Sequence, residues 1–222
     1  MKKAYDQVVQ ALPESRSAQA LLGQQMQAYS WYKETGGHVT DYPDLIAALS
    51  LQVSDDLCVM ESSGEQRLIA ASVCSPSYWN VKEKIGLSLS DIHRPVTSLQ
   101  QKIGSQIQRF IAQAPLMTPF ERSNWFVHGN RQRMHLAPEG NITGSPEQWF
   151  LRSERETLCR FHDDYLLFTI NVRFAPLRDI VHYPAALEDL TDSLSRFDAD
   201  EIDYFGGNTK YQRLGDYLAG LR

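Results

Sequence analysis

The chain has 222 residues and a formal net charge of −5, with 42% hydrophobic and 22% charged residues. This composition is that of an ordinary globular protein, and its acidic balance argues against a nucleic-acid binder, which would need a concentrated basic face. No run approaches the ~20 apolar residues of a membrane span, and the first residues lack the apolar segment of a signal peptide. Three cysteines, Cys58, Cys74 and Cys159, lie far apart without a C-x-x-C pair, which favours a reducing, cytoplasmic location.

The N-terminal part has apolar residues at helical spacing, broken at Pro13 and ended by Thr-Gly-Gly at 35–37. A further short helix is expected directly after Pro43, because proline is favoured at the start of a helix. The sequence therefore predicts a helical extension over residues 1–50.

Strand-like sequence begins near residue 56. Two apolar, β-prone runs, 56–62 and 66–75, flank a turn-rich link that contains Gly64, and this pattern predicts a β-hairpin. Residues 96–114 then predict an amphipathic helix. Its apolar face consists of Leu99, Ile103, Ile107, Phe110 and Ile111.

A second β region and a helical C-terminal part complete the chain. The strand-like runs are residues 123–129, 133–138, 147–161 and 165–177, with a turn at 162–164. Two apolar helical stripes follow; they are Leu187, Leu190, Leu194 and Phe197, then Tyr211, Leu214, Leu218 and Leu221. Because strands and helices do not alternate, the expected class is α+β with an antiparallel sheet. We expect a single domain over 1–222, with a core at 55–180 and C-terminal helices at 185–222.

Common catalytic and nucleotide-binding motifs are absent from the sequence, including Gly-rich phosphate loops, G-x-S-x-G and H-E-x-x-H. His128 and His135 lie seven residues apart across an expected hairpin. A metal site needs three or four converging ligands, and no third ligand is evident near them. Metal binding at this pair is therefore not favoured by the spacing.

The run "LRSERETL", residues 151–158, places four charges inside an apolar and aromatic stretch. On a strand, Arg152 and Glu154 would share one face and Arg155 would point to the other. The pattern favours an exposed sheet face with a cross-strand ion pair. The alternative is a partly buried carboxylate held by a cation.

His93 stands before Arg94 and Pro95 at an expected strand-to-helix junction. It can be a turn residue that caps or hydrogen-bonds its own segment. Alternatively it can be an axial ligand, because neutral imidazole is a common proximal ligand of haem iron and Pro95 would hold the loop rigidly.

Four segments together resemble one family. "CSPSYWNVKEKIGLSLSDIHRPV" is similar to its Trp…Lys-hydrophobic-Gly…Ile-His-x-Pro-Val segment, and "ERSNWFV" to its Arg-x-Asn-Trp strand. "LRSERETLCRF" and "LLFTINVRFAPL" resemble its Arg-x-Glu-Arg-x-Thr-Leu and Phe-Thr-Ile strands. This is the haem-dependent oxidative N-demethylase alpha-subunit-like family, related to dimethylamine monooxygenase, and the match covers roughly residues 55–180.

The resemblance implies a PAS-like antiparallel sheet with flanking helices that holds a non-covalent haem b. It implies a monooxygenase that uses O₂ and oxidises the N-methyl group of a small secondary amine, with release of formaldehyde. The electrons would come from a separate flavin and iron–sulfur reductase, since this chain carries no cysteine pattern for a cluster and no nucleotide fingerprint. No nucleic acid or membrane partner is expected, and a homo-oligomer is possible.

The resemblance also assigns roles to residues. His93 becomes the iron ligand, with His128 second in rank. Arg152 and Arg155 become partners of the haem propionates, and Asn124 and Trp125 line the pocket. Two residues are assigned to catalysis; they are Glu154, which would hold the substrate ammonium, and Thr157, whose hydroxyl would lie near O₂.

Two positions depart from the family pattern: Thr97-Ser98 replaces Pro-Gly, and Asn171 stands where a basic residue is common. Lost pocket residues leave a fold intact. Two alternatives to the enzyme therefore stay open: a PAS-like module that senses haem or a small ligand, and a subunit that has lost haem.

Overall fold

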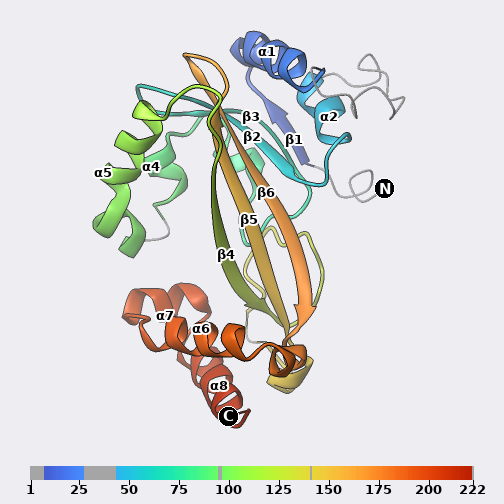
Figure 1. Ribbon diagram of the computed structural model, residues 1–222, viewed down its shortest axis with the longest axis vertical. Helices are drawn as coiled ribbons and strands as arrows, with labels where there is room; N and C mark the ends of the chain where they lie inside the picture. The colour runs from blue at the N-terminus through green and yellow to red at the C-terminus, as the bar shows by residue number, and fades with distance from the viewer. Residues whose placement is uncertain (1–7, 28–43, 95–96, 141, 222) are drawn as a thin grey trace.

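The protein is built around one six-stranded sheet (Figure 1). The computed structural model describes residues 8–27, 44–94, 97–140 and 142–221. All strand pairs are antiparallel, in the order β1-β3-β2-β6-β5-β4. The strands are β1 (Val8–Ala11), β2 (Asp56–Glu61), β3 (Leu68–Val73), β4 (Phe120–His128), β5 (Phe150–Arg160) and β6 (Tyr165–Pro176).

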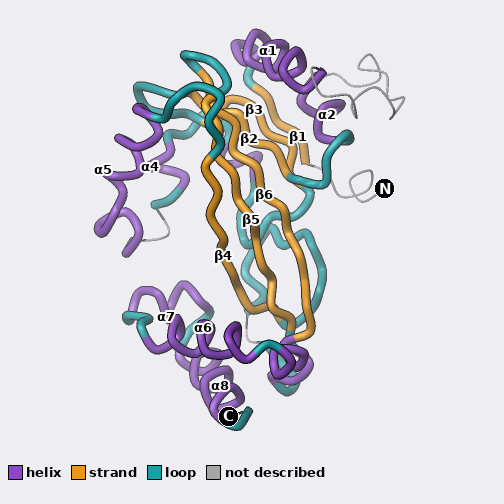
Figure 2. The backbone as a smooth tube through the Cα atoms, viewed as in Figure 1, coloured by secondary structure: helices purple, strands orange, loops and turns teal. Residues whose placement is uncertain are grey.

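Helices flank the sheet at its two ends and on its faces (Figures 1 and 2). They are α1 (Arg16–Gln27), α2 (Leu45–Ser50), α3 (Val81–Lys84), α4 (Leu89–Ile92), α5 (Thr97–Gln113), α6 (Pro184–Ser195), α7 (Ala199–Phe205) and α8 (Asn208–Ala219). Helices α1 and α2 lie at one end, and α6 to α8 lie at the other (Figure 1). The predicted α+β class with flanking helices is therefore confirmed.

The two faces of the sheet differ in composition. We call the face that carries Arg152, Glu154 and Glu156 of β5 the site face, because alternate residues of a strand point the same way. Near β2 and β3 this face is apolar and packs beneath α3, α4 and α5, with Cys58 and Leu166 among its buried residues. The opposite face packs on α1 and α2 at one end and on α6 and α8 at the other. The site face therefore changes from apolar to charged along β5.

Most predicted elements are confirmed. The hairpin is β2–β3, the amphipathic helix is α5, and residues 120–176 form the three-stranded meander β4–β5–β6. Both C-terminal stripes are buried in one apolar cluster, because α6 and α8 pack together on the sheet.

Two expectations about secondary structure are wrong. Val8–Ala11 is a strand rather than helix, because it pairs with β3 along the sheet edge; among the described residues, helical structure begins with the 3₁₀ turn Pro13–Ser15 and continues as α1 from Arg16. Residues 133–138 form no strand, and their one sheet-like contact is a parallel bridge between His135 and Ser77. Pro95, expected to stiffen the loop after His93, lies outside the described residues.

Among the described helices, none combines the length and the apolarity that crossing a bilayer requires.

Candidate functional site

A row of charged side chains crosses the site face. Arg152 Nε donates to Glu154 Oε1 at 2.7 Å, and Asn124 Nδ2 donates to Glu154 Oε2 at 3.4 Å. One step along β5, Glu156 accepts a hydrogen bond from Arg122 Nε of β4. We call these five residues the carboxylate row. Two acids thus alternate with two bases across the β4–β5 pair.

Arg152 and the two acids of the carboxylate row are largely removed from water, whereas Arg122 and Asn124 are exposed. Arg152 is 1% exposed and Glu156 is 4% exposed. Burial raises the pKa of Glu156; Arg122 opposes this effect, and the neighbouring Glu154 adds to it. Buried charges of this kind persist only when they are paired. The structure therefore favours the alternative interpretation of Arg152 and Glu154, a buried ion pair, over an exposed one.

His93 ends α4 and is held by its own backbone. Its Nδ1 lies 2.9 Å from the carbonyl oxygen of Leu89. A carbonyl oxygen can only accept, so Nδ1 carries the proton and donates. Nε2 has no partner among the described residues. This is the arrangement of a metal-ligating histidine, in which a hydrogen bond to one nitrogen fixes the tautomer and the ring.

The surroundings of His93 favour its neutral form. Burial lowers its pKa, the bond to Leu89 partly offsets this, and the nearby cations Arg122 and Lys84 lower it further. A neutral imidazole is the form that binds a metal. Arg122 thus lies close to His93 and also pairs with Glu156, so the histidine and the carboxylate row are neighbours on one side of the sheet.

Three predicted site residues lie on the opposite face. The Thr157 hydroxyl is 2.6 Å from that of Thr169, and Arg155 lies 3.6 Å from both Asp55 and Glu121. The sequence pattern of residues 151–158 favoured an exposed cross-strand ion pair. Arg155 makes such a pair, whereas Arg152 and Glu154 do not. Trp125 stacks on Phe197 with 5.9 Å between ring centroids and packs in the apolar cluster of the C-terminal helices. Of the predicted set, Asn124, Arg152 and Glu154 come together.

His128, the second-ranked ligand, is enclosed at the end of β4. It is fully buried, with Nδ1 3.2 Å from the Tyr78 hydroxyl and 3.4 Å from Glu139 Oε2. Its Nε2 lies 3.4 Å from Ser77 Oγ. Both ring nitrogens therefore have side-chain partners, unlike those of His93.

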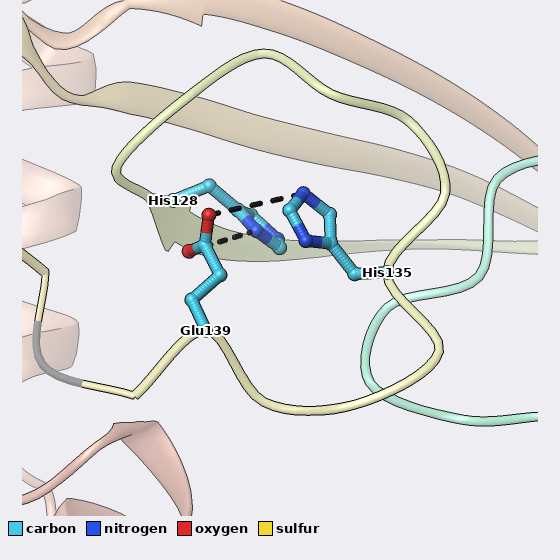
Figure 3. Close-up of side chains that lie close together, drawn as sticks. All are labelled: His128, His135 and Glu139. Carbon is cyan, nitrogen blue, oxygen red and sulfur yellow. Dashed lines mark ion pairs between the residues drawn. The ribbon is translucent and has the colours of Figure 1, made fainter.

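A third candidate ligand joins the two histidines of the expected hairpin (Figure 3). Glu139 Oε1 lies 3.8 Å from His135 Nε2, and one ligand atom from each of His128, His135 and Glu139 lies within 4.8 Å of the others. The expectation that no third ligand converges on this pair is therefore wrong. The three side chains, with Tyr78, are called the histidine cluster below.

Two of the missed residues had a signal in the sequence. Glu156 lies two positions from Glu154, so strand alternation places it on the same face, and Arg122 belongs to the recognised "ERSNWFV" strand. Glu139 and Tyr78 had none, because both lie in irregular segments brought together by the fold. The backbone of Tyr78 is left-handed, with φ 62°, and its amide donates to the His135 carbonyl at 2.8 Å.

The comparisons with known proteins agree with the resemblance seen in the sequence. A family model described as haem-dependent oxidative N-demethylase, alpha subunit-like, matches residues 1–214. None of the curated proteins matches the chain.

Proposed function

The chain belongs to the haem-dependent oxidative N-demethylase alpha-subunit-like family, and from this membership we propose that it is a haem b-dependent monooxygenase acting on a small secondary amine. The overall change would be R–NH–CH₃ + O₂ + 2e⁻ + 2H⁺ → R–NH₂ + HCHO + H₂O. Its two electrons would come from a separate reductase. The sheet with α3 to α5 inserted between β3 and β4 supports a PAS-like description.

One observation carries the haem assignment. His93 donates from Nδ1 to a backbone carbonyl at 2.9 Å and keeps Nε2 for a ligand, which fits an axial position. His128 fits it less well, because both of its nitrogens already have side-chain partners. A bound haem would supply the iron chemistry that activates O₂.

The propionates of a haem require cations, and the site face offers them. Arg122 and Lys84 lie close enough to His93 to lower its pKa. Arg152 has a buried Nη1 without a hydrogen-bond partner among the described residues, so it can still donate one bond to a carboxylate. We retain Arg152 and Asn124 in the proposed pocket. Arg155 and Trp125 are assigned to the fold, because they face the other way.

Glu154 is the proposed anchor of the substrate. A protonated secondary amine carries two N–H donors, and Glu154 is a shielded carboxylate, 13% exposed, already oriented by Arg152 and Asn124. A charge-assisted bond to Glu154 would fix the amine nitrogen and direct its methyl group. Glu156 lies beside Glu154 on the same face, and burial raises its pKa. Thr157 has no part in this proposal.

Dimethylamine turnover by Glu154→Gln tests the assignment. With haem and a chemical reductant supplied, the wild type should release formaldehyde and the variant about 100-fold less, because a misplaced substrate costs this much. Haem uptake should stay unchanged in the variant. Glu147→Gln, which changes an exposed carboxylate, is the matched control. Full activity in Glu154→Gln would remove Glu154 from the site. Haem uptake without turnover of any N-methylamine by the wild type would favour a sensor module instead.

A further inference from the structure

The histidine cluster shares no residue with the proposed haem and substrate site. His128 ends β4, while His135 and Glu139 belong to the segment 129–149 that joins β4 to β5. Figure 3 shows the Glu139 carboxylate pointing at both imidazole rings. Two imidazoles and one carboxylate form a donor set suited to zinc and related divalent transition ions rather than to calcium or magnesium.

An unsatisfied nitrogen points to a ligand at this place. His135 is 8% exposed, and its Nε2 is buried with no hydrogen-bond partner among the described residues. Glu139 Oε1 is 3.8 Å away, which is too far for a hydrogen bond. Buried polar atoms are nearly always paired. Glu139 Oε1 already accepts a hydrogen bond from Asn130 Nδ2 at 2.6 Å, so the unsatisfied atom is the His135 nitrogen, and a cation held between it and the carboxylate would supply its partner.

The spacing is close to that of a zinc centre. Zinc bonds of about 2.0–2.1 Å in tetrahedral geometry separate ligand atoms by about 3.3 Å. Glu139 Oε2 lies 3.4 Å from His128 Nδ1, and Glu139 Oε1 lies 3.8 Å from His135 Nε2; one ligand atom from each of the three residues lies within 4.8 Å of the others. Movements of up to about 1.5 Å would therefore bring the three ligand atoms to the separation that zinc requires.

The second layer of contacts is already in place. With an ion on Nδ1 of His128, its Nε2–H would donate to Ser77 Oγ, now 3.4 Å away, which is how ligating imidazoles are usually oriented. The Tyr78 hydroxyl lies 3.2 Å from Nδ1 and donates to Glu139 at 2.7 Å.

Two neighbouring cationic side chains could repel a bound metal ion, but the surroundings of each one reduce this repulsion. Arg152 is paired with Glu154. Lys210 lies between the rings of Phe126 and Phe205, and burial lowers its pKa to about 7, so its proton is easily given up.

We propose that His128, His135 and Glu139 bind one divalent zinc-class ion, which fastens the segment 129–149 to the end of β4. The segment already contacts residues 76–78 through the backbone of His135. An ion would add side-chain bonds from this segment to β4. This proposal does not depend on the proposed amine oxidation.

Zinc content of the haem-loaded protein tests the proposal. After dialysis against Zn²⁺ and then buffer, elemental analysis should find one equivalent in the wild type, with a higher Tm than in chelator. His135→Ala and Glu139→Gln should weaken zinc binding by about 100-fold or more and abolish the Tm gain. His162→Ala, which removes a histidine outside the cluster, should behave as wild type.

Two variants are used so that the test can still be interpreted if one of them does not fold. His135→Ala removes a side chain that makes no hydrogen bond among the described residues, and Glu139→Gln keeps an acceptor for Tyr78, so at least one should fold, as circular dichroism will show. The proposal is overturned if the wild type retains no zinc, or if a folded variant retains as much as the wild type. Elemental analysis measures zinc separately from the iron of the haem.

Discussion

His93 and His128 are both shielded histidines near the same sheet, yet their surroundings suit them to different tasks. His93 donates a hydrogen bond from Nδ1 to a backbone carbonyl oxygen, and its Nε2 has no partner among the described residues. His128 is fully buried, with a phenol, a hydroxyl and a carboxylate around its ring. Burial lowers the pKa of both. The two histidines therefore differ in their hydrogen-bond partners. His93 has a ring nitrogen that is open to a ligand, whereas His128 is part of an enclosed cluster.

Two neighbouring arginines of β5 also differ in their surroundings, because Arg152 is buried and Arg155 is half-exposed. This difference predicts the largest effect on the free energy of unfolding. Arg152→Ala would leave Glu154 buried without its cation, so we expect a loss of about 3–5 kcal/mol in the free energy of unfolding. Arg155→Ala removes a half-exposed partner of Asp55 and Glu121, and should cost at most about 1 kcal/mol. Urea denaturation of both variants measures the difference. Equal losses would contradict the assignment of the two faces.

The histidine cluster should add to the acid sensitivity of the fold through the carboxylate of Glu139. Burial raises the pKa of Glu139, but bonds from His128, Tyr78 and the Gly129 amide outweigh it and lower the pKa to about 2 from an ordinary 4.5. A lowered pKa means that the carboxylate stabilises the fold above pH 4.5, and that this contribution is lost as the pH falls toward 2.

Unfolding free energies in chelator therefore should differ between the wild type and Glu139→Gln by an amount that depends on pH. The gap should shrink by about 3 kcal/mol between pH 5 and pH 2. Glu147→Gln controls for the loss of one carboxylate in the same segment. A gap that stays constant with pH would show that the bonds to Glu139 do not favour its charged form.

The smallest expected effect concerns the face away from the site. Thr157→Val removes one hydroxyl contact with Thr169, which should cost about 0.5–1.5 kcal/mol. Formaldehyde release should stay within about twofold of the wild type, because Thr157 points away from Glu154. A large loss of turnover without loss of stability would return Thr157 to the active site.

The sequence predicted the parts of the fold that depend on local pattern. Strand alternation and helical stripes were sufficient for the hairpin, the meander, α5 and the C-terminal helices. Val8–Ala11 escaped prediction because its strand exists only through pairing with β3, and tertiary pairing overrides local preference.

The site was predictable to the extent that it lies on one strand. Arg152 and Glu154 share a face by alternation, and Asn124 pairs with Glu154 across the register. Thr157 and Arg155 were placed by resemblance alone, and alternation already put them on the other face. The histidine cluster was out of reach, because Tyr78 and Glu139 lie in irregular segments that only the folded chain brings together.

The visible absorption spectrum of His93→Gly, mixed with haemin and then with free imidazole, tests the central claim most directly. The wild type should show an intense Soret band of bound haem; the variant should lose it and regain it when imidazole occupies the vacated position. His162→Gly should keep the wild-type spectrum. A Soret band in His93→Gly that equals the wild-type band without imidazole would contradict the account and move the iron ligand elsewhere.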